Sequence, residues 1–539
     1  MKPMFNRMPG LSPLVLDYLG AFEKVAEFYN GDYRDPKHFL GRSDLVKART
    51  LPLGKLVPIL KEQNQRFGCG PYTLEKINLL LERQACAVVT GQQPGLFGGP
   101  LFTLYKALTA IKLAARLNRT CEGCYVPVFW LASDDHDFRE ANHVCILDRE
   151  NIPRRIAYEG YSTDARVPIS ELLVKEEISD CLQELDESTS PSEFKAEILD
   201  ELAAAYAPGS GFAGAFGTWL TRLFKAFGLI LIDPSDARVK ALAREVFRQE
   251  IEERSPSTET VLDASARLQA AGYPVQVQLH RGRLNLFYVS DERHAVEIAD
   301  DGFRVKGENL EFSRAELLQV LETKPEALSP NVILRPIYQD AVLPTVAYVA
   351  GPAEIAYFAQ LKGVYERFGL PMPIIFPRKS VTLLERHIDK ILERYALTVP
   401  DFWGDVEPLI TRIVQAQLPE ALEKQIESVV ACVNKDLRVL EEAVTEFEPT
   451  LKSTVANTRN RISGQIEHLN KKITQAYKKR NDVIAQQLHK AQNNLFPNHK
   501  LQERELNVVP YLFKYGFELV DRLYEAIDIA DFDHQIIRT

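Results

Sequence analysis

The 539-residue sequence has few cysteines, ordinary glycine and proline content, and no long uncharged apolar run. Seven cysteines, an odd number spread through a long chain, argue against a disulfide framework and favour a reducing compartment. Glycine (28) and proline (31) are too sparse for a collagenous or low-complexity chain. No stretch reaches the ~20 apolar residues that cross a bilayer, and the first ten residues do not resemble a signal peptide. We therefore expect an unexported, cytoplasmic protein that contacts no membrane.

Length and composition predict several globular domains with a sizeable core. Domains of ~100 to 200 residues would give two to four of them, and a hydrophobic content of 45% is sufficient to fill their interiors. The net charge of −9 is unevenly distributed, because residues 449–500 carry +8 and the remainder carries −17. The basic stretch therefore needs an acidic partner, inside the chain or outside it.

Short apolar segments that end in polar turns predict a parallel α/β sheet. The predicted strands, in chain order, are 85–90, 126–131, 229–232, 332–334, 345–349 and 373–376. Helical spacing of apolar residues at 101–117 follows the first strand. Ligands of such sheets bind beyond the carboxyl ends of the strands, so the polar residues found there are the candidate site. Residues 160–215 are instead acidic and helical, and the alternation at 275–312 predicts a small antiparallel sheet.

The apolar spacing changes at Leu422 to that of a coiled coil. Apolar residues recur in steps of three and four up to Phe447, and Glu448 with Pro449 then interrupts the helix. The pattern resumes and continues to Leu495, so at ~1.5 Å per residue the second arm would be long enough to protrude or to contact another subunit. The first arm is acidic and the second basic, and an antiparallel hairpin would pair them. An internal hairpin and an intersubunit bundle share one such pattern, and both stay open here.

These patterns divide the chain into three regions. They are an α/β core at 1–385 with insertions at about 150–215 and 255–325, a helical coiled-coil domain at 386–505, and a C-terminal region at 506–539 whose amphipathic helix (508–527) docks on the core.

A glycine-rich loop joins the first predicted strand to its helix. It runs from Gly91 to Pro100 and contains four glycines, so backbone amides can approach an anion near the start of the helix. The candidates for anion or nucleotide binding are Gly91, Gly98, Gly99 and Lys106, and the candidates for substrate contact are Thr90, Gln92 and Gln93. The loop matches neither GxGxxG nor GxxxxGK[ST], and a turn without a ligand is the competing interpretation.

A cluster of acids and histidines follows the second predicted strand. It comprises Asp134, Asp135, His136 and Asp137, followed by Glu140 and His143. One of the first two acids would cap a helix that places Glu140 and His143 on the face of His136. The interpretations are a capped helix with surface charge, a metal site with Cys121 and Cys124 nearby, or acid and base chemistry on an amine. We favour the last, in which carboxylates hold an ammonium group and His136 accepts its proton.

Three later segments supply further candidates for binding. They are Arg335, Gln339 and Asp340 after one predicted strand, Glu354 and Tyr357 at the start of a predicted helix, and Arg378, Lys379 and Ser380 after another strand. The cations suit substrate carboxylates, and Ser380 joins the candidates for anion or nucleotide binding. Ordinary capping turns and a solvated loop are the competing interpretations.

Four long segments occur in fixed order: TGQQPGLFGGPLFTLYKALTAIKLA, PVFWLASDDHDFREANHV, RPIYQDAVLPTVAYVAGPAEIAYFAQL and PRKSVTLLE. With these segments the chain resembles the cysteine ligase (BshC) family of bacillithiol biosynthesis, and the likeness extends through nearly the whole chain, including the coiled coil. Several long motifs in order are more specific than any single one. Where the family more often has Glu-Asp-His-Asp, this chain begins the motif with Asp134, which keeps the charge and shortens the side chain by one methylene.

The resemblance implies a Rossmann-like core with connecting-peptide insertions, similar to class I aminoacyl-tRNA synthetases, and a coiled-coil domain used in dimerisation. The implied reaction joins the carboxylate of cysteine to the amine of glucosaminyl malate. Carboxylate activation would normally consume ATP or another nucleotide, and we assign no metal ligand and no nucleophilic cysteine. The catalytic candidates are Asp134, Asp135, His136 and Asp137, and the cations for the malate carboxylates are Arg335, Arg378 and Lys379.

Two other classes of function remain as alternatives. The basic arm could follow the phosphate backbone of RNA, as helical hairpins can. Its charge has an acidic partner in the first arm, however, so we expect a homodimer without nucleic acid. A dimeric scaffold with a vestigial site is the third interpretation.

Overall fold

The computed structural model describes residues 4–416, 420–480 and 482–539. Residues 417–419 and 481, which belong to the predicted coiled-coil domain, lie outside this description. The chain forms two compact units, one of Met1–Leu383 with Lys500–Ile537 and the other of Leu384–His499 with Arg538–Thr539. Among the described residues, none of the helices combines the length and the apolar character needed to cross a membrane.

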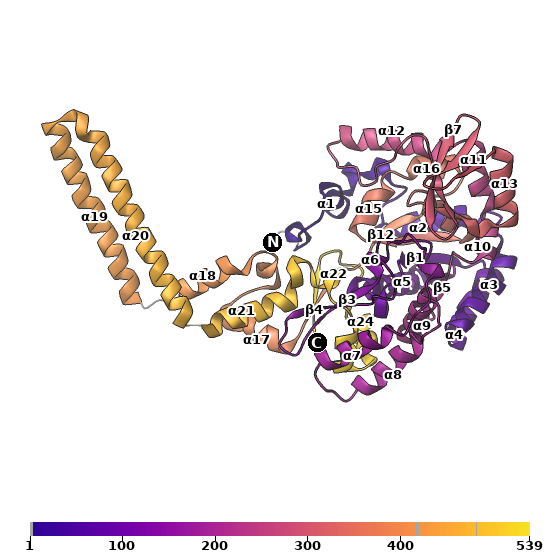
Figure 1. Cartoon of the computed structure of the whole chain (residues 1–539), viewed down its shortest axis with the longest axis horizontal. Coiled ribbons are helices and arrows are strands. Elements are labelled where there is room, and N and C mark those ends of the chain that lie inside the picture. Colours follow the sequence, from indigo (N-terminus) through magenta and orange to yellow (C-terminus); the bar gives the residue numbers. More distant parts are fainter. Residues whose placement is uncertain (1–3, 417–419, 481) are drawn as a thin grey trace. The chain divides into compact units, whose positions relative to one another are not determined.

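The first unit is built around a parallel sheet with the strand order β12-β11-β1-β2-β5, of which Figure 1 labels β12, β1 and β5. Its strands are β1 (Cys86–Gln92), β2 (Tyr125–Leu131), β5 (Ile230–Ile232), β11 (Thr345–Ala350) and β12 (Ile374–Pro377). They are buried almost throughout, which explains why the sequence shows continuous apolar runs rather than alternation. The predicted α/β class is confirmed. Because β2 and β11 flank β1, the chain reverses its direction of winding at the carboxyl end of β1.

Helices surround this sheet, and several begin with proline. Proline is favoured at this position because the first N–H groups of a helix have no partner within the helix. The helices are α1 (Pro13–Gly20), α2 (Pro36–Lys47), α3 (Leu53–Arg66), α4 (Pro71–Glu82), α5 (Leu101–Thr120), α10 (Ala237–Leu242), α11 (Arg244–Glu252), α12 (Pro256–Ala270), α14 (Leu334–Val342), α15 (Pro352–Phe358), α16 (Lys362–Arg367), α22 (Gln502–Glu505), α23 (Val509–Tyr515) and α24 (Glu518–Ala526). The buried helix α5 packs on β1 and β2 and follows the glycine loop directly.

Two further groups of elements interrupt the core. The first holds α6 (Phe138–Ala141), β3 (His143–Leu147), β4 (Pro153–Ala157), α7 (Ile178–Ser188), α8 (Lys195–Ala205) and α9 (Phe212–Phe224). The second is an antiparallel sheet of β6 (Arg283–Val289), β7 (Arg293–Ala299), β8 (Gly302–Val305), β9 (Leu310–Phe312) and β10 (Leu328–Pro330), with α13 (Arg314–Thr323). The small antiparallel sheet predicted at 275–312 is confirmed from Arg283 onward, whereas residues 275–279 form no strand and β10 adds a strand beyond the predicted range. The short strands β13 (Val381–Leu384) and β14 (Gln535–Arg538) form a separate two-stranded sheet.

Two predicted elements are wrong in the first unit. Residues 332–334 are not a strand, because the Asn331 side chain accepts hydrogen bonds from the amides of Ile333 and Leu334 and so starts α14. The single helix predicted at 508–527 is divided into α23 and α24, because Gly516 adopts a φ of 66° and ends the first of them.

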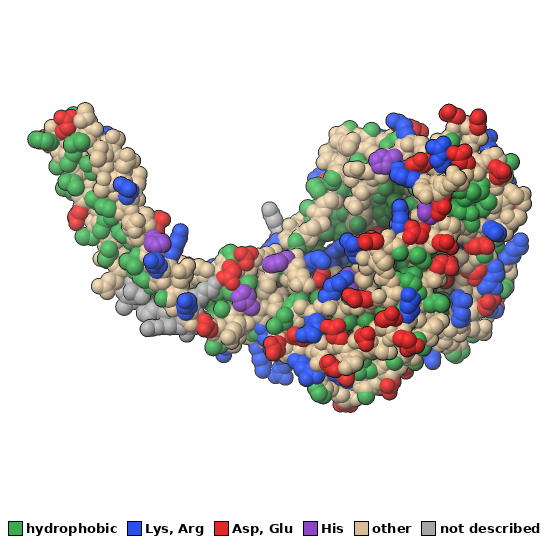
Figure 2. All heavy atoms as spheres, viewed as in Figure 1, with side chains coloured by type: hydrophobic (Ala, Val, Ile, Leu, Met, Phe, Trp, Pro, Cys, Tyr) green, Lys and Arg blue, Asp and Glu red, His purple; other side chains and the backbone are tan. Residues whose placement is uncertain are grey.

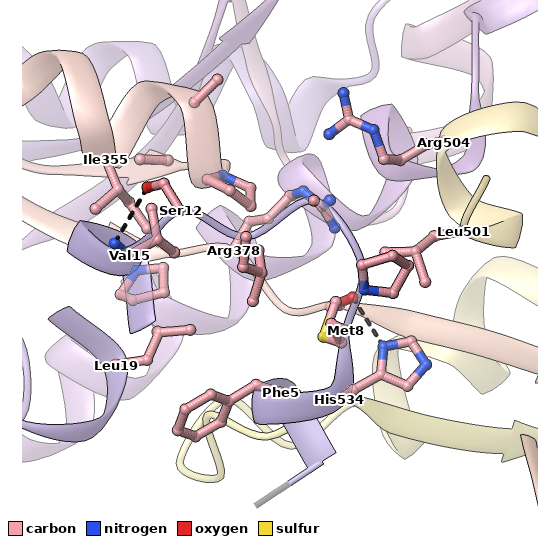
Figure 3. A pocket seen from close by; sticks show the side chains of 18 of the residues that line it. Phe5, Met8, Ser12, Val15, Leu19, Ile355, Arg378, Leu501, Arg504 and His534 are labelled. Atoms are coloured by element: carbon pink, nitrogen blue, oxygen red, sulfur yellow. Dashed lines mark hydrogen bonds between the residues drawn. The ribbon is translucent and has the colours of Figure 1, made fainter. Parts of the chain in front are cut away.

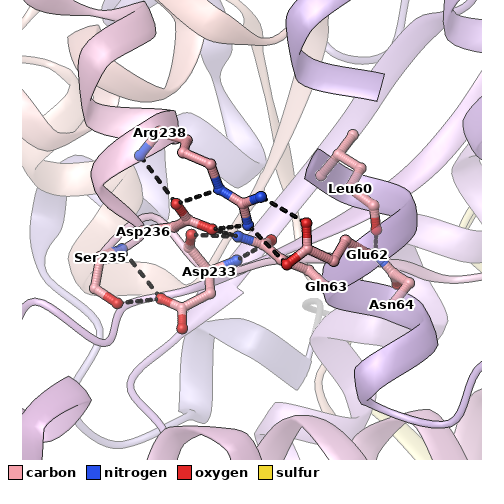
Figure 4. A network of polar contacts seen from close by, with 8 residues as sticks. All are labelled: Leu60, Glu62, Gln63, Asn64, Asp233, Ser235, Asp236 and Arg238. Atoms are coloured by element: carbon pink, nitrogen blue, oxygen red, sulfur yellow. Dashed lines mark hydrogen bonds and ion pairs between the residues drawn. The ribbon is translucent and has the colours of Figure 1, made fainter. Parts of the chain in front are cut away.

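Side-chain amides of α3 complete the outer edge of β5 (Figure 4). Asn64 donates to the Leu231 carbonyl at 2.7 Å and accepts from the Leu231 amide at 2.9 Å. Gln63 repeats this arrangement at Asp233, with distances of 3.1 and 3.0 Å. An edge strand otherwise presents unpaired backbone groups that can recruit another strand. Here a helix supplies the missing partners and fixes the turn that follows β5.

Replacing Asn64 with alanine should test this edge. The variant leaves a buried amide and a buried carbonyl of Leu231 without partners, so we expect the free energy of unfolding to fall by about 2–4 kcal/mol. Urea denaturation followed by circular dichroism measures the change. Glu62→Ala, on the exposed face of α3 beside Arg238, is the control and should leave the midpoint nearly unchanged. Equal midpoints for the two variants would contradict the role of Asn64.

The second unit contains a long helical hairpin and three shorter helices. The helices are α17 (Arg386–Tyr395), α18 (Val406–Ala416), α19 (Glu420–Phe447), α20 (Lys452–Arg480) and α21 (Asp482–Leu495). Helices α19 and α20 lie side by side and are joined at the predicted break, where the Glu448 side chain accepts from the Thr450 amide (Figure 1). An ion pair between Arg459 and Glu441 links the basic arm to the acidic one. Of the two arrangements that the sequence left open, the structure contains the internal hairpin.

The prediction that the second arm continues to Leu495 is wrong. Helix α21 instead packs on α17 and α18, which buries Leu488 and Leu495. Apolar residues in α21 have the same spacing whether they face a second arm or a group of short helices, so the sequence pattern did not separate the two cases.

Candidate functional site

A cavity of about 270 Å³ lies where the winding of the sheet reverses, at the carboxyl ends of β1 and β2. We call it the central cavity. Its charged and amide-bearing lining residues are Gln92, Gln93, Asp134, Asp135, Glu140, Arg293, Asn331, Arg335 and Glu354. Gly91 lines it as well, and Gln93 donates from its side chain to the Asp137 carbonyl at 2.8 Å. The glycine loop after β1 and the acidic segment after β2 therefore open onto the same cavity.

Lys106 of α5 fixes one wall of the central cavity. Its buried ammonium lies 2.6 Å from the Glu354 carboxylate and 2.5 Å from the Gly91 carbonyl oxygen. It also lies 3.3 Å from the side-chain oxygen of Gln92, and Tyr348 donates to Glu354 at 2.7 Å. Burial favours a higher pKa for Glu354, but Lys106 outweighs burial, so the pKa of Glu354 lies below its ordinary value. Lys106 and Glu354 thus hold β1 and α15 together across the cavity.

The two acids that line the cavity after β2 each have a cation as a partner. Asp134 lies 2.8 Å from the ammonium of Lys240, which is buried in α10. Asp135 lies 3.6 Å from the guanidinium of Arg293, which is buried at the start of β7. Both cations also donate to carbonyl groups of β10, so their positions are fixed by the antiparallel sheet. The carboxylates are therefore held in place and partly neutralised.

His136 contacts Asp135 and Arg293, which line the central cavity, and it is uncharged near pH 7. Burial and the neighbouring Arg293 lower the pKa of His136 below its ordinary value of 6.5, although Asp135 opposes the shift. Its Nδ1 lies 3.3 Å from Arg293 Nη1 and 3.5 Å from Asp135 Oδ1. Nδ1 accepts from the guanidinium, which places the ring proton on Nε2. A neutral imidazole in this position can accept a further proton.

Arg335 projects from α14 into the central cavity and is held from behind. Its guanidinium donates to the Gln339 side chain and to the Tyr357 hydroxyl, each at 3.0 Å. Gln339 in turn donates to Asp340 at 2.8 Å, and Asp340 accepts from the Tyr365 hydroxyl at 2.5 Å. Gln339, Asp340 and Tyr357 therefore support Arg335, and Arg335 is the member of this group that lines the cavity.

The helix predicted after the acidic cluster is wrong. Asp137 rather than Asp134 or Asp135 caps it, through a bond from the Glu140 amide, and α6 has only four residues. His143 belongs to β3, so no helical face joins it to His136. Within the described ranges, no group of three or more His, Cys, Asp and Glu side chains is arranged to hold a metal ion.

Thr90, Gly98 and Gly99 already have hydrogen-bond partners within the protein. Thr90 is buried, and its hydroxyl donates to the Val349 carbonyl at 3.0 Å, which ties β1 to β11. The amides of Gly98 and Gly99 donate to carbonyl groups within the loop. Asn507 donates to the Gly99 carbonyl at 2.6 Å. The amides of Gly98 and Gly99 therefore do not form the expected binding site for an anion. Neither residue is among the described residues that line the central cavity.

Arg378 and Ser380 line a second cavity, of about 330 Å³ (Figure 3). The Arg378 guanidinium binds the buried Glu503 carboxylate through two bonds of 2.7 and 2.8 Å. Ser380 lies 2.9 Å from both Glu503 and His534, and the Lys379 ammonium donates to the Asp531 carbonyl at 2.6 Å. These three candidates are therefore engaged with the C-terminal segment and are not brought to the central cavity.

Three functional candidates were missed at the sequence level. Lys240 and Arg293 pair with Asp134 and Asp135 from positions about 100 and 160 residues later in the chain, and neither lies in a recognisable local pattern. Glu140 was noted but not assigned a role. Partial burial and the carboxylates of Asp137 and Asp135 raise the pKa of Glu140, which makes it a candidate proton donor at the cavity.

The fold and the site together define a Rossmann-like α/β protein with a polar cavity at the switch point of its sheet and a coiled-coil unit. The family description "Bacillithiol biosynthesis BshC, N-terminal Rossmann-like domain" matches residues 4–379. The description "Bacillithiol biosynthesis BshC, C-terminal coiled-coil domain" matches residues 381–539. The chain belongs to the BshC family.

Curated relatives cover nearly the whole chain. Proteins named "Putative cysteine ligase BshC" from Salinibacter ruber, Chloroherpeton thalassium and Chlorobaculum tepidum are 38%, 35% and 36% identical to it. The alignments cover 97%, 98% and 96% of this chain and 96%, 96% and 95% of the respective relatives. A solved structure titled as a putative arginyl-tRNA synthetase from Campylobacter jejuni is 12% identical and covers 87% of this chain and 97% of that one. Its TM-score is 0.22, which is too low to support an inference.

The charge environment of His136 can be tested by titration. Arg293 lowers the pKa of His136 and Asp135 raises it, so Arg293→Gln should raise this pKa relative to the native protein. NMR titration of the histidine ring resonances measures the shift. Arg304→Gln, which removes an exposed arginine paired with Glu311, should leave the His136 pKa unchanged. A fall in the pKa of His136, or equal values in both variants, would contradict this description of the site.

Proposed function

We propose that this protein is a ligase that joins the carboxylate of cysteine to the amine of glucosaminyl malate, forming an amide bond in the cytoplasm. Membership of the BshC family and the names of the relatives support a role in bacillithiol biosynthesis. The observation that carries the proposal is the central cavity at the switch point of the sheet, which carboxylates and cations line and whose Asp135 and Arg293 contact the neutral imidazole of His136. A cytoplasmic site also fits the sparse, odd set of cysteines.

The amine must lose a proton before it can attack a carbonyl carbon. We place the substrate ammonium against Asp135, which lines the cavity and also contacts His136. His136 then accepts the proton at Nδ1. Arg293 Nη1 lies within reach of both His136 and Asp135, so it can shift its hydrogen bond from the ring to the carboxylate as the ring becomes charged. The freed lone pair of nitrogen forms the new bond to carbon.

Negative charge develops on the carbonyl oxygen as the amine adds. Arg335 is suited to stabilise it, because its guanidinium faces the cavity and is oriented by Gln339 and Tyr357 before any substrate binds. Preorganised donors of this kind lower the barrier more than mobile ones do. Collapse of the intermediate expels the leaving group of the activated carboxylate, which takes up the second proton of the amine nitrogen as it departs, and leaves the amide.

Activation of the cysteine carboxylate requires a source of free energy, and ATP or another nucleotide is the proposed source. The amides of Gly98 and Gly99 are used within the loop, so these two residues do not fit the expected phosphate cradle. We therefore derive no step at that loop, and the roles assigned to Asp135, His136 and Arg335 concern only the amine and the acyl carbon.

The purified full-length protein, given cysteine, glucosaminyl malate and ATP, should form the amide product, detected by mass spectrometry. GTP and CTP should be supplied in parallel reactions. His136→Ala should lower kcat about 100-fold or more, the usual contribution of a general base. His143→Ala is the matched control, because His143 lies in β3 and its ring contacts the Arg139 carbonyl and the Asn142 side chain rather than Asp135 and Arg293. Absence of product with every nucleotide, or equal losses in the two variants, would overturn the proposal.

We also propose a homodimer formed through the hairpin of α19 and α20. Large apolar side chains are exposed on the hairpin, and Figure 2 shows hydrophobic side chains along its surface. They include Val429, Val439, Leu440, Phe447 and Leu469, of which Phe447 is 88% exposed. An exposed apolar surface of this kind suits a second hairpin.

Light scattering during size-exclusion chromatography should report a dimer for the native protein. Val439→Glu combined with Leu440→Gln should shift the mass toward that of one chain, because both substitutions place polar groups on the proposed contact surface. Leu45→Glu changes an exposed leucine of α2 in the other unit and should leave the dimer intact. A native monomer, or a dimer that survives the double substitution, would contradict this interface.

A further inference from the structure

A third cavity, of about 480 Å³, adjoins the central cavity. It shares with the central cavity the lining residues Asp135, Arg293, Asn331 and Val332. The basic residues that line the third cavity are Arg166, His280, Arg283, Arg293 and Lys306, and we call this group the basic annex. None of these except Arg293 also lines the central cavity.

The basic annex carries more positive charge than its neighbours neutralise. Arg293 lies 3.6 Å from Asp135, and Arg283 lies 3.6 Å from Glu297. No ion pair involves Arg166 or Lys306 among the residues that the structure describes. Four permanent cations thus have two carboxylate partners, Asp135 and Glu297. The remaining two positive charges suit a ligand group that bears two negative charges.

The backbone places Arg166 beside the buried Arg293, even though like charges repel. The Arg293 amide donates to the Arg166 carbonyl at 2.9 Å, so the loop that carries Arg166 is tied to β7. The positive charge of Arg166 acts with burial and with Arg293 to lower the pKa of His136. Without a ligand this repulsion is unfavourable, and a bound anion would offset it.

We propose that the basic annex binds a doubly negative group of a small-molecule substrate, a dicarboxylate or a phosphate, while the reacting part of that substrate lies in the central cavity. The assignment rests on the proposed function, in which one substrate carries both an ammonium and two carboxylates. Asp135 belongs to both cavities, so an ammonium against Asp135 and a dianion in the annex can belong to one molecule. Arg166 and Lys306 then determine specificity for the anionic end.

The first test is direct binding, which does not depend on activity. L-Malate and inorganic pyrophosphate are titrated separately into the full-length protein by calorimetry. Arg166→Gln combined with Lys306→Gln should weaken binding of whichever anion occupies the annex about tenfold or more, the usual effect of losing a charged hydrogen bond. Both side chains are exposed, so the variant should fold.

The control is Arg281→Gln combined with Arg304→Gln. It changes the net charge equally in the same region, but these arginines pair with Glu259 and Glu311 and do not line the annex as described. Anion binding should match that of the native protein. If neither anion binds, or if the two double variants lose affinity equally, the annex is not a specific anion site and the proposal is overturned.

Kinetics identify which substrate supplies the dianion. A rise in KM for glucosaminyl malate with kcat nearly unchanged assigns the annex to its carboxylates, whereas a rise in KM for the nucleotide assigns it to phosphate. An unchanged KM for both substrates in an active variant would also overturn the proposal. Anion binding that depends on Arg166 and Lys306 in a protein that forms no amide would instead retain the annex and reject the proposed reaction.

Discussion

The ion pair between Lys106 and Glu354 determines the shape of the site, because it crosses the point where the sheet changes its direction of winding. A buried ammonium from α5 contacts the Gly91 carbonyl near the end of β1, and its carboxylate partner comes from the helix that follows β11. Breaking a buried pair of this kind is costly, because it leaves one charge without a partner in a medium of low polarity. The two halves of the sheet are therefore joined at the place where a ligand would otherwise separate them.

A second set of charges surrounds this pair and is supplied from distant parts of the chain. Lys240 and Arg293 neutralise Asp134 and Asp135, and the antiparallel sheet fixes both cations. The antiparallel sheet thus has a role in the site as well as in the fold. It supplies Arg293 and holds Lys240 beside acids that would otherwise repel one another, and Arg293 adds to burial in keeping His136 uncharged. The acid–base character of the cavity is a property of several segments together.

The parallel sheet was predictable because its strands are short, continuously apolar and followed by polar turns, as at 85–90 and 126–131. That Gly91 and Asp135 line one cavity was predictable as well, because ligands of a parallel sheet bind at the carboxyl ends of its strands. The rest required information that local spacing does not contain. Asn331 starts a helix by accepting two amide bonds, which no apolar pattern reveals. Arg378 looked available for a substrate because its partner Glu503 lies 125 residues later in the chain.

The pairing of α3 with β5 constrains how the sequence can vary over time. One residue of an α-helix corresponds to a rotation of about 100°, so a single insertion shortly before Gln63 would turn both amides away from the strand. Substitutions on the outer face of α3 carry no such restriction. Length changes in this region should therefore accumulate in the loops before and after α3, while the spacing from the body of the helix to Asn64 stays constant among descendants of this gene.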